Sequence, residues 1–239
     1  MVPPSANHPS FSSIKDLFDQ VAPRYNLMND VMSIGIQRYW KRVFVNMIPQ
    51  LPQICVLDLA CGTGDIGFGY LKKSFCLNPS ITLCDVSPEM LKLSKEKAIN
   101  QNIKNYFLWK ESPAESLDFP DDCFHVCTVA FGLRNFVNRS RALAEIYRIL
   151  KPGGTFLCLE FSQPEHSISS LYNLYLSTII PKAGKLVGNN EEAYTYLVKS
   201  IQQFPGVEPL KNMIEKEGFK SVTYKTLSKG IVAIHRGWK

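Results

Sequence analysis

Residues 54–67 read Ile-Cys-Val-Leu-Asp-Leu-Ala-Cys-Gly-Thr-Gly-Asp-Ile-Gly, an apolar run followed by a glycine-rich loop. The apolar run predicts a buried strand, and the helical spacing after the loop predicts a helix. Gly62, Gly64 and Gly67 satisfy the pattern G-x-G-x-x-G, and Asp85 follows 18 residues after the last of them. This order is typical of a nucleotide-binding βαβ unit, for which a tight turn without a ligand is the alternative.

The charges beside the loop indicate which nucleotide it holds. Asp58 lies near the end of the predicted strand, and Asp65 directly follows the second glycine. Two carboxylates repel a pyrophosphate but suit a ligand that carries an ammonium group. S-adenosylmethionine has such a group in its amino-acid tail, and Asp85 can accept hydrogen bonds from its ribose hydroxyls. The electrostatics therefore favour S-adenosylmethionine over a nicotinamide dinucleotide.

Strand-like and helix-like segments alternate on both sides of this loop. Ser87 is expected to cap one helix with Pro88 in its first turn, and the turn at 151–154 is expected to close another. The alternation predicts a doubly wound α/β domain with a mostly parallel sheet. The expected strands are 54–59, 81–84, 106–109, 124–130 and 155–161, and the expected helices are 65–76, 88–100 and 139–150.

The two ends of the chain depart from this alternation. Residues 1–13 are rich in Pro and Ser and are predicted to be disordered, and 14–48 form a helical arm. After the core at 49–161, residues 162–205 are helical, aromatic and predicted as an insertion. Residues 206–239 are expected to form a last helix (207–217) and a hairpin (219–227 and 231–235). We therefore expect one domain over 14–239.

Composition limits the class of protein. The chain has 239 residues, of which 45% are hydrophobic and 20% charged, so we expect a folded rather than a disordered chain. It has no apolar run long enough for a membrane span, so a membrane-spanning protein is not expected. Seven cysteines without metal-ligand spacing indicate a reducing cytoplasm and no metal site. The net charge of +6 comes from dispersed lysines, which suits an anionic membrane surface and gives no support for nucleic-acid binding.

The motifs together resemble a known family. The stretch 56–65 is similar to the first motif of class I S-adenosylmethionine-dependent methyltransferases. Further segments resemble the C-methyltransferases of menaquinone and ubiquinone biosynthesis, in register from about residue 14 to 238. They are Phe18-Asp19, Val21-Ala22, Arg24-Tyr25, Met28-Asn29-Asp30, Ser33-Ile34-Gly35, Trp40-Lys41-Arg42, Phe131-Gly132-Leu133-Arg134-Asn135, Tyr147-Arg148, Leu150-Lys151-Pro152-Gly153-Gly154, Leu159-Glu160-Phe161-Ser162 and His235-Arg236-Gly237.

The resemblance implies a Rossmann-like fold with a seven-stranded sheet, mostly parallel, whose last strand is antiparallel. It also implies cofactor contacts at a set of positions along the strand ends. Pro113 departs from the family pattern because it has no backbone N–H to donate to adenine, and Ala130 replaces a frequent serine. The implied cofactor-binding residues are Asp58, Gly62, Thr63, Gly64, Asp85, Pro113 and Ala114.

The implied reaction methylates a ring carbon of a reduced polyprenyl quinone. A phenol-type hydroxyl has a pKa near 10, so a catalyst should stabilise the phenolate, and a guanidinium can lower such a pKa by roughly 1–3 units. Arg134 is expected to stabilise the phenolate, Asn135 to orient the hydroxyl or a water, and Asp65 to position Arg134. A structural salt bridge is the alternative for Arg134.

Other residues carry weaker expectations. His235 is a candidate base, although a structural role is commoner, and Arg24 and Tyr25 could form a lid. Tyrosines 172, 175 and 194 could line a prenyl channel or belong to the core. Because the substrate comes from a bilayer, transient contact with the inner face of the membrane fits the aromatic helices. The protein could also form a homodimer.

Several functions remain open at this stage. The aromatic insertion, poor in hydrogen-bond acceptors, favours demethylmenaquinol as substrate, and the methoxybenzoquinol of ubiquinone biosynthesis is the alternative. A nucleic-acid binder or an RNA methyltransferase would need clustered basic residues with interleaved aromatics, which this sequence lacks. The intact glycine loop and the segment 131–135 disfavour an inactive scaffold, and another small-molecule methyltransferase is a further alternative. A nicotinamide-dependent reductase is disfavoured by Asp58 and Asp65.

Overall fold

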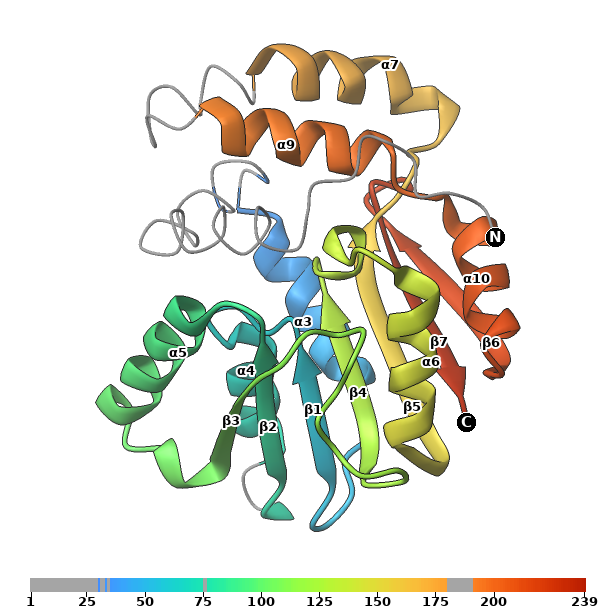
Figure 1. The fold of residues 1–239 in the computed structure, drawn as a ribbon. Helices are drawn as coiled ribbons and strands as arrows, with labels where there is room; N and C mark the ends of the chain where they lie inside the picture. Colours follow the sequence, from blue (N-terminus) through green and yellow to red (C-terminus); the bar gives the residue numbers. More distant parts are fainter. Residues whose placement is uncertain (1–29, 31–32, 34, 75–76, 180–190) are drawn as a thin grey trace.

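The computed structural model describes residues 30, 33, 35–74, 77–179 and 191–239 (Figure 1). The segment predicted to be disordered, 1–13, lies outside the described residues. So do the first part of the arm, 14–29, and with it the two proposed lid residues, Arg24 and Tyr25.

Seven strands form a sheet in the order β3-β2-β1-β4-β5-β7-β6. The strands β3, β2, β1, β4 and β5 are parallel to one another, and β7 is antiparallel to both β5 and β6, as predicted. The strands are β1 (Cys55–Leu59), β2 (Ser80–Asp85), β3 (Phe107–Glu111), β4 (Phe124–Ala130), β5 (Leu150–Phe161), β6 (Lys220–Leu227) and β7 (Val232–Trp238).

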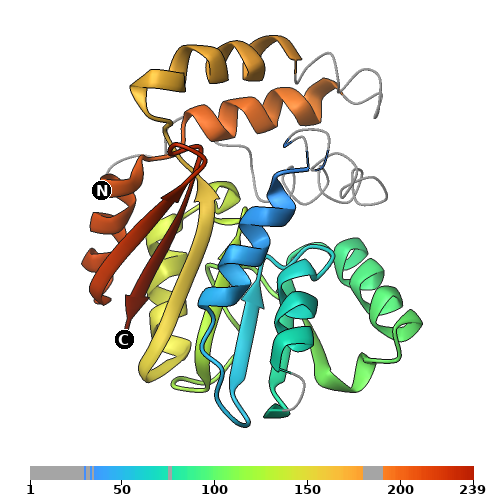
Figure 2. The same ribbon diagram turned by 180° about the vertical axis from the view of Figure 1, so that it is seen from behind.

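Helices cover both faces and one edge of the sheet (Figures 1 and 2). The core cluster on one face includes side chains of α3 and α4, and the cluster on the other includes side chains of α6 and α10. Within the described residues, no helix is long and apolar enough to cross a membrane. The helices are α3 (Gln37–Met47), α4 (Asp65–Ser74), α5 (Pro88–Asn100), α6 (Arg139–Ile149), α7 (His166–Leu174), α9 (Glu191–Gln202) and α10 (Val207–Lys216), with the short turns η3 (Lys104–Tyr106), η4 (Leu133–Asn135) and η5 (Tyr175–Ile179).

The predicted helical insertion is a cap on the site. Between β5 and α10 the chain forms α7, the π-helical turn η5 and α9. Both views show α7 and α9 lying beyond the carboxyl ends of β1, β4 and β5 (Figures 1 and 2). Ligands of open α/β sheets bind outside these ends, so the insertion covers the region where the site is expected.

Local signals placed several element boundaries correctly. The Ser87 hydroxyl accepts a hydrogen bond from the Met90 backbone N–H at 3.1 Å, and Pro88 starts α5 as predicted. The segment 151–154, however, does not separate α6 from the next strand. The strand begins already at Leu150, which pairs with Phe124, and a register shift follows. A β-bulge thus absorbs the residues that were expected to form the turn.

The C-terminal strand is longer than predicted. β7 continues past His235 to Trp238, because the antiparallel partner β5 supplies hydrogen bonds up to the pair Thr155–Trp238. The glycine at 237 fits this position well, since an added Cβ would lie 3.2 Å from the Phe219 Cβ. The family-like segment at 235–237 therefore has a structural role in the sheet.

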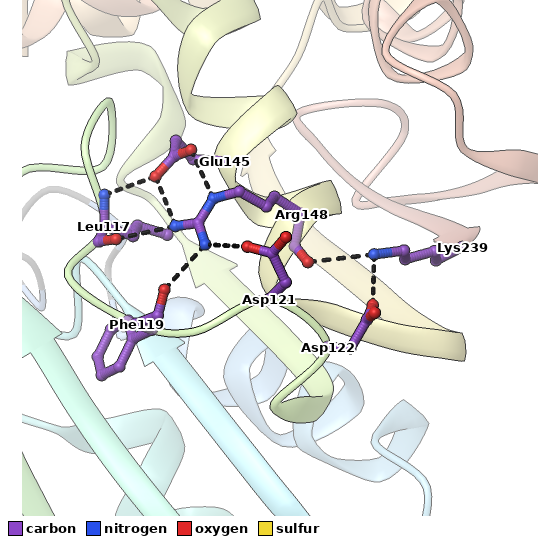
Figure 3. Close-up of polar contacts among 7 residues, drawn as sticks. All are labelled: Leu117, Phe119, Asp121, Asp122, Glu145, Arg148 and Lys239. Atoms are coloured by element: carbon purple, nitrogen blue, oxygen red, sulfur yellow. Dashed lines mark hydrogen bonds and ion pairs between the residues drawn. The ribbon is translucent and has the colours of Figure 1, made fainter.

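A polar network, here called the Arg148 network, ties the amino edge of the sheet together (Figure 3). The Arg148 guanidinium binds the Glu145 carboxylate at 2.8 Å and donates to the backbone carbonyls of Leu117 and Phe119. These contacts fasten the loop between β3 and β4 to α6. The network consists of Leu117, Phe119, Asp121, Asp122, Glu145, Arg148 and Lys239.

Candidate active site

The glycine loop adopts the conformation that its sequence predicts. Gly62 and Gly64 have φ of 53° and 80°, in the left-handed region that favours glycine. A Cβ on Gly64 would also lie 2.7 Å from the Phe68 ring, and one on Gly67 would lie 2.6 Å from the Leu83 side chain. The close packing brings the Gly67 N–H within 3.1 Å of an Asp58 carboxylate oxygen.

A first cleft, the adenosine cleft, opens beside this loop with an empty volume of about 700 Å³ that includes space open to solvent. Ligand sites commonly have a mostly apolar lining with a few polar groups. Asp85 lies in it and accepts hydrogen bonds from the backbone N–H groups of Gly62 (2.7 Å) and Ser87 (3.0 Å). The lining residues are Leu59, Ala60, Gly62, Asp85, Val86, Met90, Ser112, Pro113, Ala114, Glu115, Phe131, Gly132, Asn135, Phe136 and Val137.

A second, smaller cleft, the tail cleft, lies on the other side of the carboxyl end of β1. It shares Ala60 and Phe131 with the adenosine cleft, and both of these residues have a positive φ. Non-glycine residues in this region cost about 1–3 kcal/mol and often mark functional sites. The tail cleft is lined by Lys41, Asp58, Ala60, Cys61, Thr63, Asp65, Ile66, Ala130 and Phe131.

Asp58 is the most perturbed carboxyl group of the tail cleft. It is 1% exposed, and its oxygens accept hydrogen bonds from the Thr128 hydroxyl at 3.0 Å and from the Gly67 N–H. Burial raises the pKa of Asp58 to about 7, against the opposing effect of these two hydrogen bonds. Both donors are neutral, so a cationic group in the cleft would favour the ionised carboxylate.

The two clefts fit S-adenosylmethionine. The apolar adenosine cleft accommodates the nucleoside and places the Asp85 carboxylate where ribose hydroxyls can donate to it. The tail cleft offers Asp58 to the ammonium group. Pro113 and Ala114 line the adenosine cleft as expected. The Ser112 hydroxyl is already bonded to the Ser116 carbonyl at 3.0 Å, so it does not replace the donor that Pro113 lacks.

The predicted pairing of Asp65 with Arg134 is wrong. The two Asp65 oxygens bind Lys41 at 2.9 Å and Lys97 at 2.7 Å. Burial raises the pKa of Asp65, but the two ammonium groups outweigh it and hold this pKa at about 2. Asp65 opens α4, and its side chain reaches toward α3 and α5 rather than toward β4.

Glu160 is the partner of Arg134. The Arg134 guanidinium binds a Glu160 oxygen at 2.9 Å, and the Arg134 N–H binds the other at 3.2 Å. The side chains are 6% and 1% exposed. Arg134 also donates to the Phe131 carbonyl, while its Nε finds no partner within the described residues. Sequence reasoning missed Glu160, although its place at the carboxyl end of β5, beside β4, was a usable signal.

Asn135 lines the adenosine cleft and is held by the cap, whereas Arg134 lines neither cleft. The Asn135 side-chain oxygen accepts a hydrogen bond from the Tyr196 hydroxyl of α9 at 3.1 Å. Burial raises the pKa of Tyr196 and of Tyr172, while the positive charge of Arg134 opposes the rise at both. The structure thus brings Arg134, Asn135 and two tyrosines together. The Tyr194 side chain lies outside the described residues.

His235 does not belong to this site. It is 1% exposed, its Nε2 contacts the Val207 carbonyl at 2.9 Å, and its ring packs 5.5 Å from the Tyr224 ring. Burial lowers the pKa of His235. It lines neither cleft, so the structural interpretation holds.

The chain is similar to known proteins over most of its length. Residues 7–239 match the ubiE/COQ5 methyltransferase family. The chain is 44% identical over 227 residues to the ubiquinone/menaquinone biosynthesis C-methyltransferase UbiE of Zymomonas mobilis, covering 95% of this chain and 92% of the relative. It is 41% identical over 261 residues to the mitochondrial 2-methoxy-6-polyprenyl-1,4-benzoquinol methylase of Mus musculus, covering 95% and 80%.

Solved structures share the fold at low sequence identity. A SAM-dependent methyltransferase from Thermotoga maritima has a TM-score of 0.66 at 17% identity, covering 94% of this chain and 99% of that one. A SAM dependent methyltransferase from Aquifex aeolicus has a TM-score of 0.59 at 16% identity, covering 95% and 97%. Both comparisons support the seven-stranded methyltransferase fold.

Proposed function

Since the chain belongs to the ubiE/COQ5 methyltransferase family and is an S-adenosylmethionine-dependent C-methyltransferase of ubiquinone or menaquinone biosynthesis, we propose that it converts demethylmenaquinol to menaquinol. The methoxybenzoquinol intermediate of ubiquinone biosynthesis is the second candidate, favoured by the likeness to the murine benzoquinol methylase. The two substrates differ in the size of the aromatic ring system that the site must hold.

An aromatic cluster supports the larger ring. Phe131 lines both clefts, and the sulfonium lies between the nucleoside and the tail of the cofactor, so Phe131 is near the methyl group to be transferred. Its ring lies 5.0 Å from Phe161 and 6.2 Å from Trp40. Aromatic rings at such distances interact favourably. Phe131 is the member of this cluster that lines the clefts, and Phe161 and Trp40 pack behind it. A naphthoquinol would present a larger flat face to Phe131 than a benzoquinol does.

The residues at the carboxyl edge suit phenolate chemistry. S-adenosylmethionine supplies an electrophilic methyl group. The quinol hydroxyl loses a proton, the neighbouring ring carbon bonds to the methyl as the carbon–sulfur bond breaks, and the ring C–H proton then leaves. Burial raises the pKa of Tyr172 and Tyr196 and the Arg134 charge opposes the rise, so Arg134 would favour the phenolate of a quinol placed among them against the effect of burial. Asn135, held by Tyr196, orients that hydroxyl.

The test is the transfer of labelled methyl from S-adenosylmethionine to demethylmenaquinol and to the methoxybenzoquinol, each in reduced and oxidised form. We expect transfer to the reduced naphthoquinol and little to either quinone. Preference for the reduced benzoquinol would replace the proposed substrate. Equal transfer to oxidised acceptors would contradict the phenolate mechanism.

The cap suggests how a lipid substrate reaches the site. On α7, Leu171 and Leu174 are 71% and 59% exposed and lie three residues apart, on one side of the helix. We propose that this side of α7 contacts the cytoplasmic face of the membrane transiently. Leu171→Glu/Leu174→Glu should lower sedimentation with anionic vesicles and leave methylation of a short-chain, water-soluble quinol unchanged.

The matched control is Leu108→Glu, because Leu108 is 63% exposed on the edge strand β3, away from the cap. It should sediment like the unmodified protein. If the α7 variant instead changes only the mass of the particle in solution, the leucines form a homodimer contact and the membrane proposal is wrong.

A further inference from the structure

Lys41 connects the N-terminal arm to the cofactor-binding loop. It lies on α3, directly after Trp40, whose indole N–H donates to the Ser228 hydroxyl at 2.8 Å. The Trp40 ring is 3% exposed. The tryptophan therefore fixes this turn of α3 against the sheet, and the next side chain, Lys41, is directed into the tail cleft.

The charges of the tail cleft are complementary to an α-amino acid. Lys41 and the carboxyls of Asp58 and Asp65 line it. Asp65 does not depend on Lys41 alone, because its other oxygen binds Lys97 at 2.7 Å. Lys97 does not line the cleft. Lys41 can therefore turn to an incoming anion while Asp65 keeps a cationic partner.

We propose that Lys41 binds the carboxylate of the methionine tail of S-adenosylmethionine, while Asp58 binds the ammonium group. Lysine recognises a carboxylate as a compact charge with three donors. The Lys41 side chain is 17% exposed, so the contact forms where water screens it poorly. The arm then takes part directly in cofactor selection, which its position outside the α/β core does not suggest.

The test compares S-adenosylmethionine with its decarboxylated form, which keeps the ammonium and sulfonium groups but lacks the carboxylate. Binding to the full chain is measured by calorimetry. Lys41→Met should weaken binding of S-adenosylmethionine about 10- to 100-fold, the effect expected for one lost charged hydrogen bond. It should leave binding of the decarboxylated compound nearly unchanged, so the preference for the carboxylate disappears.

Lys97→Met is the matched control, since it removes the other cation from Asp65 without removing a group from the cleft. We expect it to keep the preference for S-adenosylmethionine over the decarboxylated form. Thermal unfolding of both variants shows whether they are folded. If Lys41→Met weakens both ligands equally, Lys41 only positions Asp65, and the proposal is wrong. Unchanged affinity for S-adenosylmethionine would contradict it as well.

Discussion

Two arginines, each paired with a glutamate, sit at opposite edges of the same sheet. At the amino edge, the Arg148 side chain is 31% exposed and holds the loop between β3 and β4, while the Arg148 backbone carbonyl accepts a hydrogen bond from Lys239 (Figure 3). At the carboxyl edge, Arg134 and Glu160 are 6% and 1% exposed, and one guanidinium nitrogen has no partner among the described residues. The first pair fastens a loop at the surface, whereas the second is buried next to Asn135, which lines the adenosine cleft.

Left-handed backbone conformations occur at both edges, since Gln53, Asn78 and Asp122 at the amino edge also have a positive φ. Ala60 and Phe131, which follow β1 and β4, have φ of 53° and 59°. An added Cβ on the neighbouring Gly132 would lie 2.6 Å from the Ala60 Cβ. Strained residues often cluster at functional sites. Ala60 and Phe131 line both clefts, whereas the strained residues of the amino edge line neither.

The largest expected effect on stability comes from removing Arg134 while its partner Glu160 stays buried at the carboxyl edge. Arg134→Met leaves the Glu160 charge buried without its partner and should lower the free energy of unfolding by about 3–5 kcal/mol. The double variant Arg134→Met/Glu160→Met should recover most of that loss, because two apolar side chains of similar size replace the pair. Chemical denaturation measures both.

Activity separates the catalytic role of Arg134 from its structural one. In the double variant we expect the turnover number to stay at least about 100-fold below wild type, as when a charge-stabilising donor is removed from an active site. Affinity for S-adenosylmethionine should change little. A double variant that regains turnover together with stability would show that the pair is structural only.

A second expected effect concerns pH and the tail cleft. With a pKa of about 7, Asp58 is protonated at pH 5.5 and half ionised at pH 7, and only the ionised form attracts the ammonium group. Affinity for S-adenosylmethionine should therefore rise about tenfold between these values. Asp58→Asn should bind weakly with a flat profile, measured by calorimetry.

The same pKa has a consequence for stability without ligand. A carboxyl whose pKa is raised in the folded state binds its proton more tightly there than in the unfolded chain. Its contribution to stability is therefore lost as pH rises from about 4 through 7. Asp58→Asn should lose less stability than wild type over this range, by thermal unfolding. Parallel curves for the two proteins would mean that Asp58 is ionised throughout.

The smallest effect is expected at the amino edge. Arg148→Ala removes the donors to the Leu117 and Phe119 carbonyls and should cost about 2 kcal/mol, since water replaces part of the lost contacts. The turnover number should remain near wild type. Affinity for the cofactor should fall a few-fold, because the loosened loop is continuous with Pro113 and Ala114. Arg148→Lys should recover little, since lysine lacks the forked donors.

Local patterns in the sequence predicted most of the fold and half of the site. The glycine loop, Asp85 and Asn135 were predictable because each directly follows a strand, and parallel strands bring their carboxyl ends to one edge. The bulge at the start of β5 and the length of β7 were not, because both depend on the strand that pairs with them. Tyr196 was likewise missed as a partner of Asn135, since the cap joins segments 61 residues apart.

Residue spacing and charges close together in the chain determined the doubly wound α/β fold, the edge of the sheet that holds the clefts and the preference for a cofactor with an ammonium group. The resemblance of the motifs added the seven-stranded methyltransferase fold. Only the tertiary structure decided how the ions pair. Asp65 joined Lys41 and Lys97, and Arg134 joined Glu160. The reason is physical: a buried charge takes the partner that packing brings within about 3 Å, and sequence separation carries little information about which one that is.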